Sequence, residues 1–187
     1  MLAWISGKIL KWRGWTIKGK QPELKKYVII AAPHTSNWDF FIFLTLKWAL
    51  KLRVNFIGKH TLFVGPIGWF LRKIGGRPVN RTQSKNLVDA IVDLFNTSDE
   101  FIFALAPEGT RSYKDHWKSG FYYIALKANV PIQICFLDTS NKHIGFGPLL
   151  EPSGDLQSDQ KVLEEFYKNI KGIKPELFSK ITFTTEK

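Results

Sequence analysis

The sequence is poor in the residues that cross-link small proteins or bind metal ions. It contains a single cysteine, Cys135, and four dispersed histidines among 187 residues. One cysteine excludes an internal disulfide, and no Cys/His cluster has the spacing of zinc or iron–sulfur ligands. We therefore expect a fold that depends on its hydrophobic core and a function that needs no metal and no resident cofactor.

Long apolar runs are missing as well. The nearest candidate, residues 40–46, ends at Lys47, which is far short of the roughly 20 apolar residues of a membrane-spanning helix. The first 20 residues are interrupted by Lys8, Lys11 and Arg13, unlike the apolar core of a secretory signal peptide. These features predict a cytoplasmic protein that at most lies peripherally on the inner face of the membrane.

Negative charge is scarce in the first half of the chain. Residues 1–26 hold seven basic residues and one acidic residue, and residues 47–85 hold nine basic residues and no acidic one. The whole chain has 27 basic and 16 acidic residues, a formal net charge of +11. Such a charge predicts an anionic partner: a nucleic acid, a bilayer surface or a phosphorylated metabolite. Nucleic acid is the least favoured of these, because no helix-turn-helix, zinc-finger or RNA-recognition pattern is present.

The N-terminal segment, residues 1–15, combines apolar, aromatic and basic residues. Leu2, Ile5, Ile9 and Trp12 follow helical spacing, and basic residues lie between them. This pattern predicts a short basic amphipathic helix, which is typical of helices that lie on an anionic membrane surface. The alternative is a helix that packs on the core of the domain.

Short apolar segments alternate with segments of helical periodicity along the chain. We expect strands at residues 27–32, 55–58, 101–106 and 131–137 and helices at residues 36–52, 65–74, 84–95, 120–128 and 162–170, with a loop at residues 75–81. Alternating strands and helices indicate an α/β fold. The sequence thus predicts a single domain, residues 1–187, with a mostly parallel buried sheet flanked by helices.

A histidine and an aspartate lie at the junction of the first expected strand and the first helix after it. His34 is in the turn after the strand, and Asp39 follows five residues later in the first helical turn. Asp39 folded back toward the ring would orient the imidazole and leave Nε2 to remove a proton from a substrate hydroxyl. The alternative is that Ser36 and Asp39 form a capping box that only satisfies the helix N-terminus.

A second polar turn follows the buried strand at residues 101–106. Residues 107–112 read Pro-Glu-Gly-Thr-Arg-Ser. Gly109 allows close approach of a ligand, Thr110 and Ser112 offer hydroxyl groups, and Arg111 can bind a phosphate with two hydrogen bonds. An ordinary solvated loop remains the alternative reading of this turn alone.

Taken together, four ordered blocks resemble those of the glycerophospholipid acyltransferase superfamily, which contains glycerol-3-phosphate and lysophosphatidic acid acyltransferases. The blocks are His34-Thr-Ser-Asn-Trp-Asp39, Gly-Arg-Pro-Val-Asn-Arg at residues 76–81, Pro-Glu-Gly-Thr-Arg at residues 107–111 and Val-Pro-Ile at residues 130–132. They cover residues 27–137. Three features depart from the family pattern: Ala106 before the third block, Arg77 within the second, and at most one short helix in place of the two-helix N-terminal membrane motif.

The resemblance implies O-acyl transfer of the His-x4-Asp type. His34 is then the general base and Asp39 its orienting partner. Backbone N–H groups of the turn at Glu108 and Gly109 would stabilise the oxyanion, with Thr110 in the same acceptor loop. His60, His116 and His143 have no partner in the sequence and are expected at the surface, and Cys135 is expected in the core.

The resemblance also implies the substrates. Arg81 and Arg111 would bind the acceptor phosphate, with Lys59 as a third candidate. The acyl donor would be acyl-CoA or acyl carrier protein, and the favoured acceptor is a lysophospholipid, 1-acyl-glycerol-3-phosphate, in phospholipid biosynthesis. Alternatives are another acceptor, such as glycerol-3-phosphate, another lysolipid, an amino-acid lipid or a glycolipid, or a non-catalytic protein that binds lipid at the membrane surface.

Overall fold

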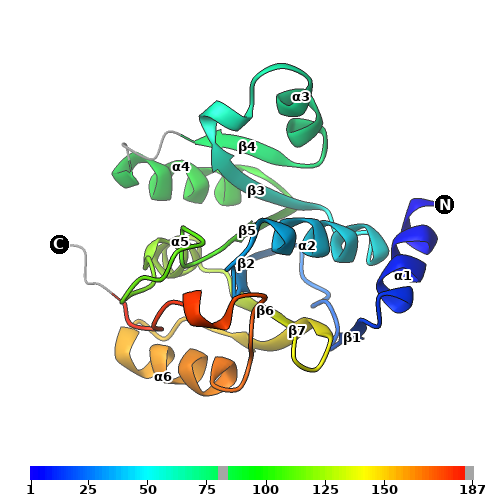
Figure 1. Cartoon of the computed structure of the whole chain (residues 1–187). Helices are drawn as coiled ribbons and strands as arrows, with labels where there is room; N and C mark the ends of the chain where they lie inside the picture. The colour runs from blue at the N-terminus through cyan, green and yellow to red at the C-terminus, as the bar shows by residue number, and fades with distance from the viewer. Residues whose placement is uncertain (80–83, 184–187) are drawn as a thin grey trace.

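The computed structural model of the chain describes residues 1–79 and 84–183 and has a seven-stranded sheet at its centre (Figure 1). The strand order is β1-β7-β6-β2-β5-β3-β4. The strands are β1 Thr16–Lys18, β2 Lys26–Ala32, β3 Val54–Lys59, β4 Gly76–Val79, β5 Phe101–Leu105, β6 Ile132–Asp138 and β7 His143–Leu150. Strands β2 to β6 are parallel to one another, and only the pairing of β6 with β7 is antiparallel. This confirms the mostly parallel α/β sheet.

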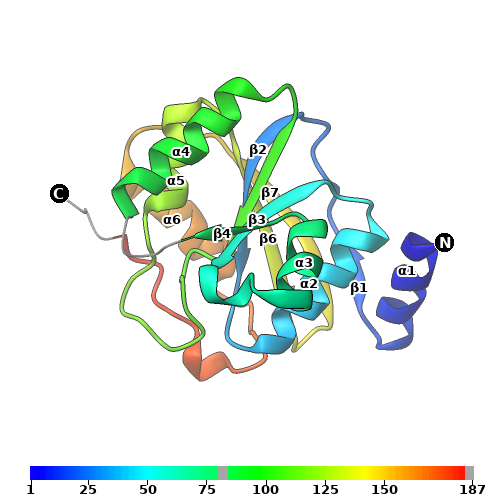
Figure 2. The same ribbon diagram turned by 90° about the horizontal axis from the view of Figure 1, so that it is seen from above.

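Helices cover both faces of the sheet. Helices α1, α2 and α3 lie on one face and α4, α5 and α6 on the other, as the two views show (Figures 1 and 2). The helices are α1 Leu2–Trp12, α2 Asn37–Ala49, α3 Gly65–Lys73, α4 Ser84–Thr97, α5 Gly120–Ala128 and α6 Leu156–Tyr167, with short 3-10 turns η1 His60–Leu62 and η2 Pro175–Leu177. No helix in the described ranges combines the length and the apolar character that a membrane crossing needs.

The central strand β2 shows how the two layers share one sheet. Val28 and Ile30 belong to the cluster formed with α4, α5 and α6, whereas Tyr27 and Ile29 belong to the cluster formed with α1 and α2. All four side chains are buried. A strand covered on both faces reads as a continuous apolar run rather than an alternating one, which is why the sequence identified it directly. The single α/β domain is built around this strand.

Three strands and one helix boundary differ from the expectation. Residues 75–81 were expected as a loop, but β4 occupies the edge of the sheet, where Pro78 is tolerated because its missing N–H needs no partner. Strands β1 and β7 were not expected, since β1 is very short and β7 carries Gly145, Gly147 and Pro148. The last helix begins six residues earlier than expected, because Asp155 caps it by accepting hydrogen bonds from the N–H groups of residues 157 and 158.

Candidate active site

The carboxyl ends of five parallel strands meet at one edge of the sheet. β6, β2, β5, β3 and β4 lie side by side in that order and run in the same direction. Loops that follow such strands emerge together, and this edge is where open α/β sheets bind ligands. His34 follows β2, Glu108 follows β5, and Lys59 is the last residue of β3. Arg81, which was expected to bind phosphate, lies outside the described residues.

His34 and Asp39 are neighbours in space. His34 Nδ1 lies 3.4 Å from Asp39 Oδ2, and the histidine side chain is 22% exposed whereas that of Asp39 is fully buried. The same Oδ2 accepts hydrogen bonds from the backbone N–H groups of Thr35 (2.7 Å) and Ser36 (2.8 Å), and Ser36 completes a capping box at the start of α2. The capping box and the histidine partner were alternatives in the sequence, and the structure contains both.

This arrangement has a direct chemical consequence. Because Nδ1 faces the buried carboxylate, Nε2 is the ring nitrogen on the opposite side. The separation of 3.4 Å is longer than an ordinary N–H···O hydrogen bond, a distance that catalytic pairs commonly shorten when substrate binds. Asp39 Oδ1 is also buried and has no hydrogen-bond partner in the described part of the chain. Asp39 therefore places beside the ring a buried carboxyl group, one oxygen of which also accepts two backbone hydrogen bonds.

Glu108 ties the two motif loops together. Its side chain is 1% exposed, and its Oε1 accepts a hydrogen bond of 2.6 Å from the backbone N–H of His34. Burial raises the pKa of the Glu108 carboxyl above its ordinary value, an effect that the hydrogen bond from His34 and contact with Ser179 oppose. The sequence placed Glu108 only in an oxyanion or acceptor loop. Its side chain also holds the backbone of the residue that carries the imidazole, and the oxyanion role of the turn stays a prediction.

The turn at residues 106–112 is closed by its own hydrogen bonds. The Gly109 N–H donates to the carbonyl of Ala106 at 3.0 Å, although it was expected to face an oxyanion. In this structure the group thus donates within its own turn, and its role at an oxyanion stays a prediction. Gly109 has φ +64, a left-handed conformation that favours glycine. A Cβ there would lie 3.0 Å from the flexible Lys118 side chain. Thr110 Oγ1 accepts from the N–H of Ser112 at 3.3 Å.

Lys59 and Arg111 supply positive charge at the same edge. Both side chains are exposed. Lys59 ends β3, which is separated from β2 only by β5, so it lies about 10 Å from the end of β2 at the usual strand spacing. Arg111 is on the loop whose Glu108 contacts His34. Both residues therefore lie at or after the ends of strands at the carboxyl edge of the sheet.

A C-terminal segment that the sequence did not implicate contacts both motif loops. The backbone N–H of Lys174 donates to Thr35 Oγ1 at 3.1 Å, and a Cβ at Gly172 would come within 2.9 Å of Pro33 and Thr35. Ser179 Oγ accepts from the N–H of Lys114 at 3.1 Å, on the loop after β5. Nothing local in residues 171–179 signals this role, because the contacts depend on chain reversal after α6.

Other candidate groups lie apart from this edge. Cys135 is buried in β6 as expected, and burial raises the pKa of its thiol to about 12. His116 was expected to lack a partner, but its Nδ1 lies 2.7 Å from Asp115 Oδ1 at the surface. A hollow of about 400 Å³ opens at the amino ends of the strands, near Lys25 and Asn55, on the opposite edge from His34. Within residues 1–79 and 84–183 no group of acidic, histidine and cysteine side chains is placed to hold a metal ion.

Comparison with known proteins gives consistent results. The model of the family described as acyltransferase matches residues 15–137, roughly two thirds of the chain. Among solved structures, the chain is similar to the 1-acyl-sn-glycerophosphate (LPA) acyltransferase PlsC from Thermotoga maritima. The TM-score is 0.62, the sequences are 19% identical, and the match covers 89% of this chain and 77% of that chain. At this identity the likeness establishes the fold. No curated protein matches the sequence.

Proposed function

The chain belongs to the acyltransferase family, and from that premise we propose that it transfers a fatty acyl group from a thioester donor to a hydroxyl of a lysophospholipid. The observation that carries the proposal is the pairing of His34 with the buried Asp39 at the carboxyl edge of the sheet. A binding protein needs no such pair. The donor would be acyl-CoA or acyl carrier protein, and 1-acyl-glycerol-3-phosphate is the favoured acceptor.

The chemistry requires a base and a partner for it. His34 Nε2 removes the proton from the acceptor hydroxyl while the oxygen attacks the thioester carbonyl carbon. Asp39 keeps Nδ1 protonated and stabilises the positive charge that develops on the ring. When the tetrahedral intermediate collapses, the carbon–sulfur bond breaks, and the thiolate takes up the proton held by His34. No covalent enzyme intermediate is needed.

Glu108 and the basic side chains contribute position and charge. The hydrogen bond from the His34 N–H to Glu108 fixes the base relative to the loop after β5, and Arg111 on that loop would bind the acceptor phosphate. Lys59 and Arg81 are the further phosphate ligands we propose. A phosphate held this way orients the hydroxyl toward Nε2, and such positioning contributes a large share of the rate in bimolecular transfers.

The acceptor is the least constrained part of the proposal. The similar protein from T. maritima is named for 1-acyl-sn-glycerophosphate, which supports a phosphomonoester lysolipid. Arg77 departs from the family pattern and keeps a different acceptor open, and its guanidinium lies over the ring of Phe101 at 6.0 Å. Other lysolipids, glycerol-3-phosphate, amino-acid lipids and glycolipids are the alternatives that an acceptor panel separates.

Thiol release from acyl-CoA and from acyl carrier protein tests the activity directly. The purified full chain is assayed with lysophosphatidate, glycerol-3-phosphate, monoacylglycerol and other lysolipids, with His34→Ala beside each. We expect release that depends on a phosphomonoester acceptor and disappears in the variant. Release that persists in His34→Ala would refute the role of His34, and no release with any pair of substrates would favour the non-catalytic lipid-binding alternative.

We also propose that α1 contacts an anionic membrane surface, so that the enzyme is peripheral on the inner face. Leu10 and Ser6 are buried against the domain, whereas Trp4 and Trp12 are exposed. The helix thus packs on the core and still presents an apolar face. Replacing Trp4 and Trp12 with serine, which leaves Leu10 in place, should reduce co-sedimentation with anionic vesicles, and unchanged binding would contradict the role of α1.

A further inference from the structure

Exposed large apolar side chains are concentrated on one layer of the domain. Of 18 such side chains in the described residues, 13 lie on α1, on the first turns of α2 and on the segment from η1 to α3. These are Met1, Leu2, Trp4, Ile5, Ile9 and Trp12, then Trp38 and Phe41, and then Leu62, Val64, Ile67, Trp69 and Phe70. We name these 13 residues the apolar face. Scattered exposed apolar residues are normal, but a grouping of this kind marks an interaction surface.

On the side opposite its exposed residues, α3 packs against β3, β4 and α2. Phe63 is buried and lies so close to Gly58 and Gly68 that a Cβ at either would collide with it. A Cβ at Gly76 would collide with the carbonyl oxygen of Leu71. Lys47 on α2 donates to the carbonyls of Val54 and Ile74, the second at the C-terminal end of α3. The helix is therefore fixed to β3, β4 and α2, and its exposed side chains point away from these contacts.

Helix α3 repeats the surface chemistry of α1. Lys8 lies over the ring of Trp4 at 5.5 Å on α1, and Lys73 lies over the ring of Trp69 at 4.9 Å on α3. In both helices the basic residue follows the tryptophan by four positions, so that the pair shares one face. Trp4 is 69% exposed and Trp69 is 63% exposed. Indole rings at headgroup depth, with lysine side chains reaching toward phosphates, are typical of membrane interfaces.

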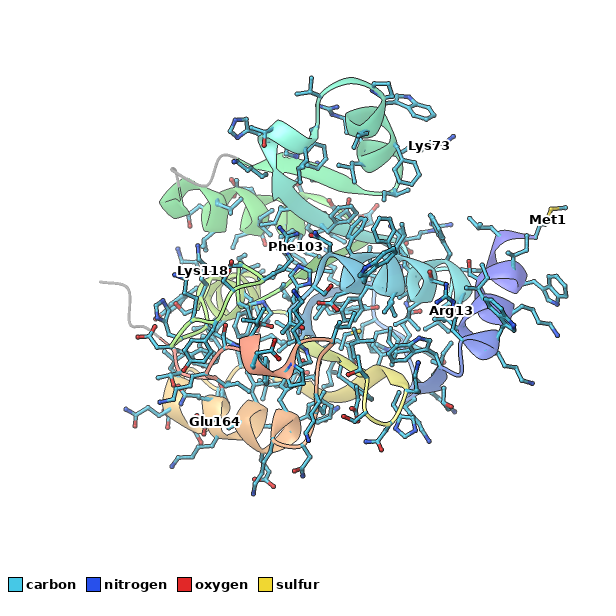
Figure 3. The ribbon with its side chains drawn as sticks, viewed as in Figure 1. Met1, Arg13, Lys73, Phe103, Lys118 and Glu164 are labelled. Carbon is cyan, nitrogen blue, oxygen red and sulfur yellow. The ribbon has the colours of Figure 1, made fainter. Side chains whose placement is uncertain are left out.

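Charge selects among the possible partners of the apolar face. Helices α1 and α3 contain no acidic residue, and the one acidic residue of α2, Asp39, is fully buried. The opposite layer, by contrast, exposes acidic side chains such as Asp89 on α4 and Glu164 on α6. Figure 3 shows Met1 and Lys73 projecting on the side of α1 and α3, away from Glu164. The apolar face is therefore complementary to a surface that is both apolar and anionic.

We propose that α3 with η1 is a second membrane-contacting element, which together with α1 lays the apolar face on an anionic phospholipid bilayer. This membrane contact would bring the protein to its proposed lipid acceptor, so its role in the cell rests on the proposed function. Trp38 and Phe41, on the first two turns of α2, lie four and seven positions after His34 in the chain and extend the apolar face toward the loop that carries it. A bilayer on this face would therefore deliver a lysophospholipid beside the carboxyl edge of the sheet.

A fluorescent probe at residue 67 tests the contact without an activity assay. Ile67→Cys introduces an exposed thiol on α3, whereas Cys135 is buried and its thiol has a pKa of about 12, so an environment-sensitive dye labels the new site. We expect a blue shift of the dye emission with phosphatidylglycerol-containing vesicles and none with phosphatidylcholine alone. Val162→Cys on α6, which is also exposed, is the matched control and should show no shift.

A binding measurement complements the probe. Ile67→Ser combined with Trp69→Ser should weaken binding of the full chain to anionic vesicles by about a hundredfold or more, as expected for loss of two large apolar contacts. Lys73→Glu should weaken it too, whereas Lys161→Glu on α6 should not. The proposal would be overturned if the dye at residue 67 showed no emission shift with anionic vesicles while the α1 variants lost vesicle binding. So would a blue shift that grows with protein concentration without lipid, because that result identifies a second copy of the chain as the partner. Neither outcome depends on acyl transfer, so failure here is distinct from failure of the proposed function.

Discussion

Replacing Asp39 with asparagine separates the two roles of this side chain. The amide oxygen of Asp39→Asn can still accept the hydrogen bonds that Oδ2 now receives from Thr35 (2.7 Å) and Ser36 (2.8 Å). The capping box at the start of α2 therefore keeps its geometry. With the amide oxygen in the Oδ2 position, the carboxylate charge beside His34 Nδ1 is lost, and only a neutral and weaker acceptor remains beside the ring.

The size of the effect follows from the distance. Two unit charges 3.4 Å apart interact by about 5 kcal/mol at an effective dielectric constant near 20. This value is an upper bound on the stabilisation of the developing imidazolium, and it corresponds to a fall in kcat of at most about 4 × 10³-fold. The stability cost should be smaller, about 1 to 2 kcal/mol, because the hydrogen bonds change from charged to neutral rather than disappear.

The assay is thiol release from acyl-CoA with lysophosphatidate, run beside thermal unfolding. Asp159→Asn is the matched control, since Asp159 is also a buried aspartate whose Oδ2 accepts two hydrogen bonds of 2.8 Å, from Tyr122 and from Ser153 N–H. It lies on α6, remote from His34, so it should lose a similar amount of stability while kcat stays within about twofold. A kcat of Asp39→Asn above one tenth of the wild-type value would refute the orienting role.

Two further predictions concern the elements that hold the site. Glu108→Gln should keep the hydrogen bond from His34 N–H and change the pH dependence of stability. Burial raises the pKa of the Glu108 carboxyl in the folded state. The protonated carboxyl therefore stabilises the fold at acidic pH, and this stabilisation is lost as pH rises through the raised pKa. Unfolding measured from acidic to neutral pH should show the wild type losing stability relative to the variant, and parallel curves would contradict this. Gly172→Ala should lower kcat and destabilise by about 1 to 3 kcal/mol, because its Cβ would come within 2.9 Å of Pro33 and Thr35. Gly120→Ala, where a Cβ meets nothing within 4 Å, is its control, and equal effects of the two substitutions would show that the contact with Pro33 is unimportant.

The elements predicted well are those whose signal is local. Strand β2 and strand β5 are apolar runs buried on both faces, and helix α4 carries a clear helical period. Strand β4 was missed because its signal is weak: Gly76, Arg77 and Pro78 read as a loop, and only pairing with β3 makes them a strand. The same holds for β1, whose three residues are a strand only because β7 lies beside them.

For the site, the sequence showed the order of the motifs along the chain, but it did not show which of them contact one another in the folded protein. Spacing alone suggested that Asp39 returns toward His34, and the contact at 3.4 Å bears this out. The hydrogen bond between Glu108 and the His34 N–H joins residues 74 positions apart. It exists because β2 and β5 are adjacent and parallel, and strand order is not encoded in any local pattern.

The sequence by itself determined the fold class and the layering, because burial periodicity is a property of neighbouring residues. It predicted His34 and Asp39 as base and partner from their spacing together with the resemblance to the acyltransferase superfamily. The tertiary structure decided which loops share an edge, that the Gly109 N–H is used within its own turn, and that residues 172–179 contact both motif loops. It also decided that α3 shares one face of the sheet with α1 (Figure 1). These features depend on contacts between distant segments, which form only when the whole chain packs around one sheet.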